Sequence, residues 1–187
     1  MGDVAALDVG LDRDVFLREL VGQLVGTLED VVGLDQAEGY VSVVGRAIGA
    51  MLDRRYRSAM GADRLDTESI AAVLVDLKRR IEGGFRIASV EGGRIVLVNA
   101  ACPFGDRVIG RPSLCMMTMN VFGTIAAENA GFARVAIPEA IATGAAGCRV
   151  VIDLDPDSET DCDGDPDAVG GARGGVHGAR EFFRTGA

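Results

Sequence analysis

The change of hydrophobic period at Gly83-Gly84 is the strongest constraint on the fold. Before this pair, apolar residues recur every three or four positions, which is typical of amphipathic helices. After it, residues 85–91 and 94–99 have the composition and length of strands and flank Gly92-Gly93, a two-residue hairpin signal. The chain is therefore expected to begin with helices and to continue with an antiparallel sheet.

Three helices are expected before the change of period. Asp12 can cap the first, from about residue 13 to 32, and the others cover roughly 36–58 and 68–81. Glycines disfavour a helix interior, so those in the first two helices indicate close helix–helix contact, which could join two copies of the chain. The alternative is composition alone, because the chain has 26 glycines. The glycines concerned are Gly22, Gly26, Gly39, Gly45 and Gly49.

The second part of the chain predicts a loop, a helix over 113–129, strands over 132–137 and 148–154, and a short helix or turn over 138–146. The order is helix, helix, helix, strand, strand, helix, strand, strand. It predicts an α+β fold in which N-terminal helices precede a small antiparallel sheet with a packed helix.

The predicted domain, residues 12–156, is flanked by segments of low apolar content. We expect residues 1–11 to be a flexible arm and residues 157–187 to be a disordered tail, first acidic and then rich in glycine. Phe182-Phe183 could be a docking patch in this tail. The Asp-rich stretch 161–167 resembles a calcium loop, but it lacks the glutamate that would close one.

Charge and hydropathy exclude several classes of protein. The net charge of −9 argues against direct nucleic-acid binding, and basic residues at 54–57 and 78–80 suit the ends of helices. No apolar run reaches the length of a membrane span, and the acidic N-terminus does not resemble a secretory signal. We therefore expect a cytoplasmic protein without membrane attachment, in which cysteines serve metal or redox chemistry.

Cys102, Cys115 and Cys148, three of the four cysteines, lie where the chain changes element. Cys115 falls in the first turn of the 113–129 helix, where the helix dipole favours a thiolate. Cys102 precedes Pro103 in a turn that would leave N–H groups free for a sulfur, and Cys148 opens the last strand. These thiols could converge at one end of the sheet and bind a metal. The alternative is that each is a small buried hydrophobe.

Three cysteines alone do not identify the type of metal centre. A closed zinc site or an iron–sulfur cluster normally takes four ligands. The fourth could be Cys162, an acidic residue, a partner's cysteine or an exogenous ligand. The only histidine, His177, lies in the tail. This position argues against a haem with a histidine ligand and against a Cys–His catalytic pair.

Two further classes of function remain open. A small apolar ligand could bind between the fourth helix and the sheet, where Met116, Met117, Met119 and Phe122 cluster. Cys115 could alternatively be a nucleophile, although a base is missing unless one of three nearby residues assists, and we favour a binding protein over an enzyme. The three residues are Asp106, Arg107 and Glu128.

Four segments resemble the methanogen output domain, over roughly residues 12–156: Cys102-Pro-Phe-Gly, Pro112-Ser-Leu-Cys115, the helical run 120–127, and Gly147-Cys-Arg-Val-Val-Ile. This module is similar to hydrocarbon-binding domains of the 4-vinyl-reductase type, which occur beside response-regulator and DNA-binding modules. The resemblance implies a sensory domain.

The cysteine pattern also resembles the C-terminal half of the cyanobacterial repressor of iron–sulfur cluster assembly, where such cysteines hold a cluster. The twelve residues between Cys102 and Cys115 agree with its first pair. The repressor's next cysteine would fall near Asn129, and its winged helix is absent here.

The sequence thus predicts a regulatory sensor that binds an iron–sulfur cluster or zinc through Cys102, Cys115 and Cys148. Without a DNA-reading module, it would signal to a regulatory protein partner. We expect a homodimer through the first two helices to carry the signal.

Overall fold

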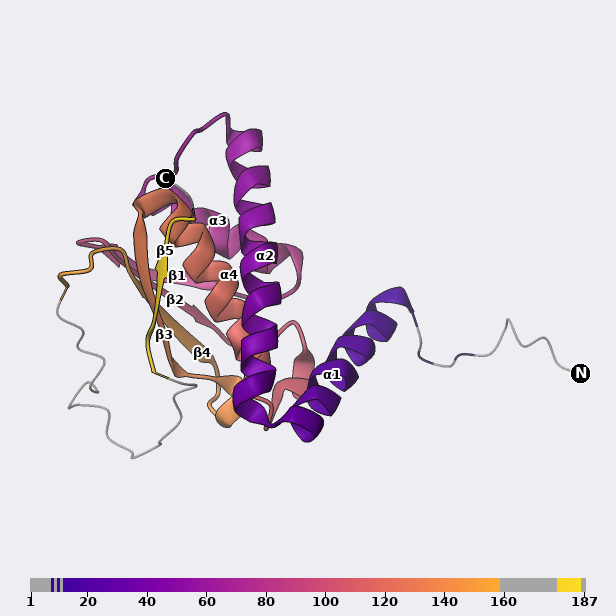
Figure 1. The fold of residues 1–187 in the computed structure, drawn as a ribbon. Helices are drawn as coiled ribbons and strands as arrows, with labels where there is room; N and C mark the ends of the chain where they lie inside the picture. The colour runs from indigo at the N-terminus through magenta and orange to yellow at the C-terminus, as the bar shows by residue number, and fades with distance from the viewer. Residues whose placement is uncertain (1–7, 9, 11, 159–177, 186–187) are drawn as a thin grey trace, which may run out of the picture.

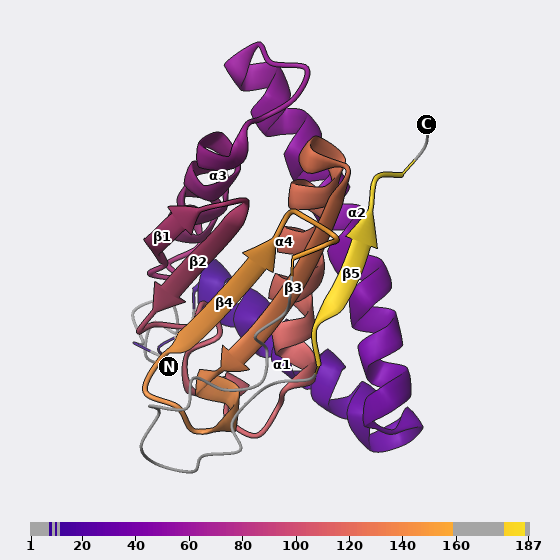
Figure 2. The ribbon, with the colours of Figure 1, turned by 90° about the vertical axis from the view of Figure 1, so that its left-hand side faces the viewer.

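The computed structural model describes residues 8, 10, 12–158 and 178–185 of the chain. An antiparallel sheet of five strands, in the order β1-β2-β4-β3-β5, is covered on one face by helices (Figures 1 and 2). The predicted α+β fold and the order of its elements are confirmed. The helices are α1 (Arg13–Val32), α2 (Leu34–Met60), α3 (Thr67–Arg80) and α4 (Ser113–Ala130). The strands are β1 (Arg86–Glu91), β2 (Arg94–Asn99), β3 (Phe132–Glu139), β4 (Cys148–Asp153) and β5 (Arg180–Phe183).

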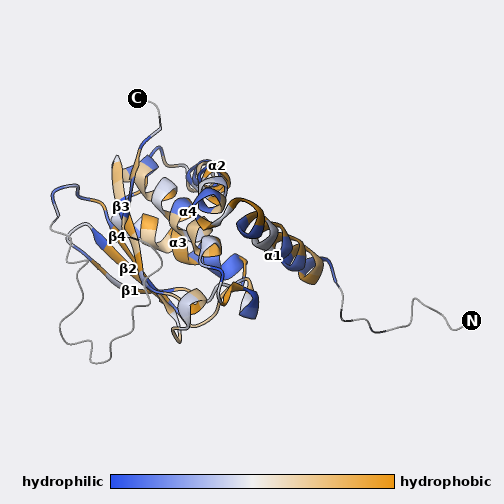
Figure 3. Ribbon diagram, turned by 60° about the horizontal axis from the view of Figure 1, so that its bottom comes forward, coloured by the Kyte–Doolittle hydropathy of each residue, from blue (hydrophilic) through white to orange (hydrophobic). Residues whose placement is uncertain are grey.

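Helix α4 is the centre of the packing. Its side chains are buried over most of its length, between the sheet and α2, and Figure 3 shows its hydrophobic colouring. Helix α3 lies beside it over β1 and β2, whereas α1 extends away from the body of the molecule (Figure 1). None of the helices in the described part of the chain is long and apolar enough to cross a membrane.

Side-chain caps begin α1 and α3, and the cap at Asp12 is the one that the sequence analysis predicts. The carboxylate of Asp12 accepts the Val15 N–H at 2.8 Å, and the carboxylate of Asp66 accepts the Ser69 N–H at 2.8 Å. These bonds satisfy amide groups that have no partner inside the first turn.

The glycines of α1 and α2 serve contacts within one chain, which corrects their predicted use between two chains. A Cβ at Gly45 would lie 2.7 Å from Asn120 Cβ, and one at Gly49 would lie 2.8 Å from Thr124 Cβ, so both glycines let α2 approach α4. Gly22 and Gly26 instead face Arg107 and Arg111. A Cβ at the fifth glycine, Gly39, would meet no atom within 4 Å.

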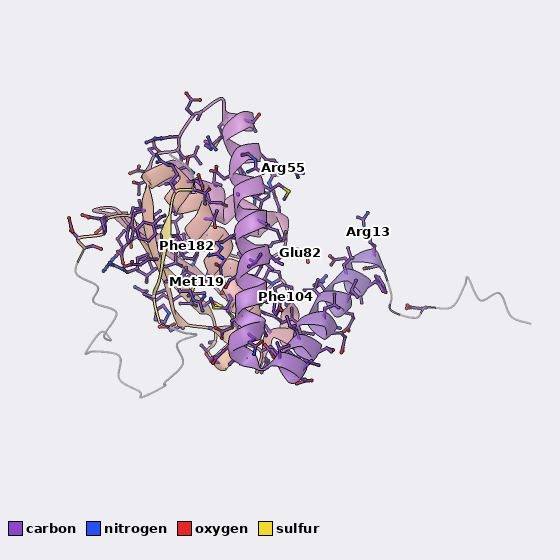
Figure 4. The ribbon with its side chains drawn as sticks, viewed as in Figure 1. Arg13, Arg55, Glu82, Phe104, Met119 and Phe182 are labelled. Atoms are coloured by element: carbon purple, nitrogen blue, oxygen red, sulfur yellow. The ribbon has the colours of Figure 1, made fainter. Side chains whose placement is uncertain are left out.

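Strand β5 lies within the segment 157–187 that the sequence predicts to be disordered. It pairs with β3, and Phe182 (labelled in Figure 4) is buried against Gly123 of α4, where a Cβ would collide with its ring. Phe183 stacks edge-on against Phe132 at 5.5 Å between ring centroids. Four residues in a polar, glycine-rich context give too weak a pattern to predict this strand. The other predictions for residues 1–11 and for the tail, including those for Cys162 and His177, concern residues that lie largely outside the described part of the chain.

Candidate functional site

Three thiols from three separate elements line one cavity of about 30 Å³. Cys102 lies in the turn after β2, Cys115 in the first turn of α4, and Cys148 at the start of β4. The predicted convergence of these residues is therefore confirmed. Most of the remaining wall is apolar and includes Phe85, Phe104, Val108, Leu114, Ile137, Ile141 and Val150.

Asn99 holds the two strand ends that carry Cys102 and Cys148. It is the register partner of Cys148, its side-chain oxygen accepts the Cys148 N–H at 2.8 Å, and its amide donates to the carbonyls of Gly83 and Ala101. Gly147 lies against the carbonyl of Asn99, where a Cβ would collide with the oxygen. The close approach at this glycine therefore fixes the position of the neighbouring cysteine.

Backbone amides point at two of the sulfurs. The Ile141 N–H donates to Cys148 Sγ at 3.5 Å, and the amide of Phe104 (labelled in Figure 4) forms a hydrogen bond that favours the thiolate of Cys102. The expected supply of N–H groups from the turn at Pro103 is thus present. Such bonds stabilise negative charge on sulfur and tune metal centres that thiolates hold.

Burial keeps all three thiols protonated at neutral pH. It raises the pKa of Cys102 and Cys148, and it raises the pKa of Cys115 to about 12. The expectation that the helix dipole would favour a thiolate at Cys115 is wrong for this environment, because the loss of solvent outweighs the dipole. The Cys115 N–H is also occupied, since it donates to the Pro112 carbonyl at 2.9 Å.

Lys78 is a residue of this site that the sequence analysis assigned to a helix end. It lines the cavity from the last turn of α3 and is only 6% exposed. Its Nζ donates to Thr118 Oγ1 at 2.7 Å and lies 5.5 and 5.2 Å from the ring centroids of Phe85 and Phe122. One signal could have found it, because Lys78 is the only lysine in the sequence.

Other residues considered for function lie elsewhere. Met116, Met119 and Phe122 belong to the closed core and Met117 packs against it, and none of the described methionines lines the cavity wall. Arg107 pairs with Glu19, and Glu128 accepts hydrogen bonds from Thr185. Neither of these residues nor Asp106 lines the cavity that contains Cys115. Within the described residues, no group of three or more His, Cys, Asp or Glu side chains is arranged so that it could hold a metal ion.

The segment between Cys102 and α4 connects the cavity with α1. The 3-10 helix η2 (Gly105–Val108) and the residues after it contact α1 through three side chains. Arg107 pairs with Glu19, Arg111 donates to the Gly22 carbonyl at 2.7 Å, and Ser113 bonds Glu29. A change in the cavity wall can therefore reach the helix that extends from the body.

Two comparisons with known proteins support the fold. In solved structures, the chain resembles trafficking protein particle complex subunit 3 from Naegleria fowleri, a protein covalently bound to palmitic acid. The TM-score is 0.52 at 13% sequence identity, over 75% of this chain and 96% of that one, which shows a shared fold. No protein with a curated description matches the sequence. Among protein families, residues 20–153 match methanogen output domain 1. Because this match covers most of the chain, the protein belongs to the methanogen output domain 1 family.

Proposed function

We propose that this protein is a regulatory sensor domain in which Cys102, Cys115 and Cys148 bind a metal centre, either zinc or an iron–sulfur cluster. The observation that carries the proposal is the meeting of three thiols from distant parts of the chain in one cavity. Soft thiolate ligands favour zinc, copper(I) and iron–sulfur centres. Because the thiols are protonated when buried, metal binding must displace their protons and is expected to weaken as the pH falls.

The size of the cavity favours a compact centre. About 30 Å³ is enough for a single ion, whereas a cluster would need the cavity to widen, and pockets for organic ligands usually measure several hundred Å³. Metal binding would require the three sulfurs to adopt a common coordination geometry, which rotation about χ1 can supply. A fourth ligand would come from outside the three cysteines.

Signalling in this proposal passes through α1. Filling the cavity would alter the wall formed by residues 102–115, which bonds α1 through Arg107, Arg111 and Ser113. The helix carries exposed apolar side chains that a dimer partner or a regulatory protein would cover. These are Phe16, Leu17, Leu20, Leu24 and Val31. The proposed location is the cytoplasm, where thiols stay reduced.

Purification without oxygen, followed by analysis for zinc, iron and sulfide and by a visible spectrum, tests this function. We expect about one centre per chain in the wild type and its loss in Cys102→Ser, Cys115→Ser and Cys148→Ser. Cys162→Ser then shows whether the remaining cysteine supplies the fourth ligand, because its loss would in that case also weaken the centre. A colourless, metal-free wild type that stays metal-free after anaerobic incubation with zinc, or with iron and sulfide, would contradict the proposal.

A second candidate is an apolar-ligand module in which the cysteines are structural or accept a covalent ligand. The apolar wall of the cavity favours it, and one solved structure of similar fold is covalently bound to palmitic acid. In this case the cavity would have to widen on binding. Native mass spectrometry should then show a mass above that of the bare chain, and equal native and sequence masses would count against it.

A further inference from the structure

Lys78 differs from the other buried charges of this protein in its surroundings. Asp53 and Asp153 are buried beside Arg57 and Arg94, with N–O distances of 2.8 and 2.6 Å. By contrast, no ion pair joins Lys78 to a carboxylate of the described residues. Its ammonium group contacts the hydroxyl of Thr118 and the rings of Phe85 and Phe122. A buried ammonium group with only neutral partners is costly, because these groups replace only part of its hydration.

The cavity wall contains three other titratable side chains, and all of them are thiols. Lys78, Cys102, Cys115 and Cys148 line the same cavity of about 30 Å³, so the ammonium group and the three thiols are near neighbours. Negative charge on these sulfurs would therefore supply the ionic partner that the described carboxylates do not.

We infer that Lys78 is the charge partner of an anionic thiolate centre held by Cys102, Cys115 and Cys148. This inference rests on the proposed metal-binding function and specifies the charge of the occupant. Three thiolates and a core of charge two, with a neutral fourth ligand such as water, sum to a single negative charge, which the ammonium group of Lys78 neutralises. A divalent ion or a cluster with a core of that charge meets the condition. Each thiol gives its proton to solvent on binding, and no electron is transferred.

The competing explanation is that Lys78 is a structural side chain whose alkyl stem fills space over Phe85 and Phe122. The two roles differ in their response to removal of the charge. A charge partner makes the metal-free protein less stable and the metal-loaded protein more stable. If only the alkyl stem of Lys78 matters, its contribution to stability is the same in the metal-free and the metal-loaded protein.

The test uses the full chain with zinc as the probe. Lys78→Met keeps the stem and removes the charge, whereas Arg79→Met removes one positive charge from a side chain on the same helix that is 70% exposed. With effective dielectric constants near 20, loss of a neighbouring charge is expected to weaken zinc binding about a hundredfold in Lys78→Met. Arg79→Met should bind zinc within about threefold of the wild type, because exposed charges are screened. Competition with a chelator measures these affinities.

Thermal melting supplies the second readout. Metal-free Lys78→Met should melt above the metal-free wild type, and the order should reverse when both are loaded with zinc. Unchanged zinc affinity in Lys78→Met, or an equal loss of stability with and without zinc, overturns the inference and leaves the proposed function standing. Absence of zinc, iron and cluster binding in the wild type overturns both.

A measurement on the wild type covers the case in which Lys78→Met does not fold. Because Lys78 is the only lysine, protein labelled with ¹³C-lysine gives the NMR signals of one lysine side chain. Its Cε signal should shift when zinc fills the site. A Cε signal that stays in place at saturating zinc contradicts the inference.

Discussion

Burial lowers the pKa of Lys78 to about 8 from an ordinary value of 10.5, although the neighbouring thiols act in the opposite direction. Between these two pH values the unfolded chain binds more protons than the folded one, so the contribution of Lys78 to stability rises with pH. Below about pH 8 the full cost of burying the cation is present. The thiols have raised pKa values in the folded protein. Their contribution to stability therefore falls as the pH rises above about 9, where the thiols of the unfolded chain ionise.

The first prediction isolates Lys78 from the thiols by comparing the metal-free wild type with Lys78→Met. Between pH 7.5 and pH 10, the unfolding free energy of the wild type should rise relative to that of the variant by about 2–3 kcal/mol. Urea unfolding at several pH values measures this difference. A difference that stays constant with pH would show that Lys78 has an ordinary pKa in the folded protein.

For single residues, the sequence predicted that the three cysteines come together, but it did not predict that burial raises the pKa of their thiols. The change of element at Cys102, Cys115 and Cys148 placed each thiol at a junction, and the antiparallel pairing of Asn99 with Cys148 brought two of them together. The pKa of Cys115 depends on the side chains that close over it, and the sequence does not specify them. The same holds for Lys78, because its position late in a helix is also typical of a solvent-exposed cation.

Among the elements, α2 and α4 offer a matched test of the glycine contacts. Gly49→Ala should destabilise the protein by about 1–3 kcal/mol, because the new methyl group meets Thr124 Cβ at 2.8 Å and the Val121 carbonyl at 3.1 Å. Gly39→Ala lies on the same helix in open space and should stabilise it by up to about 1 kcal/mol. Denaturant unfolding compares the two. Equal effects would mean that α2 is not packed closely on α4.

The helix and strand bounds were largely predictable, whereas the contacts between elements were not. Side-chain caps fix where α1 and α3 begin, and the hydrophobic period with the glycines that follow it indicates where α1, α3 and α4 end. The glycine pattern of α1 and α2 predicts close contact without identifying the contacting element. Four of the five glycines contact residues of the same chain. Strand β5 was missed because its register comes from β3 and its niche from Gly123, both distant in sequence.

For the whole molecule, the exposed apolar side chains of α1 predict self-association. Leu20, Leu24 and Val31 lie on one strip of the helix and are 43%, 62% and 75% exposed. The full chain should therefore be a dimer at tens of micromolar, and Leu20→Glu with Leu24→Glu should make it a monomer. Met60→Glu, at the far end of α2, is the control. Light scattering measures the mass, and a monomeric wild type with and without zinc would contradict this prediction.

Strand β5 also has a consequence for synthesis on the ribosome. Residues 180–183 are translated after every other strand, so the outer edge of β3 stays unpaired while the nascent chain emerges. An unpaired edge beside the apolar Phe132 is a site for wrong pairing between chains. A protein that stops at residue 158 keeps this edge permanently and should form aggregates on concentration, detectable by light scattering. If the shortened protein stays as soluble as the full chain, the edge needs no cover from β5.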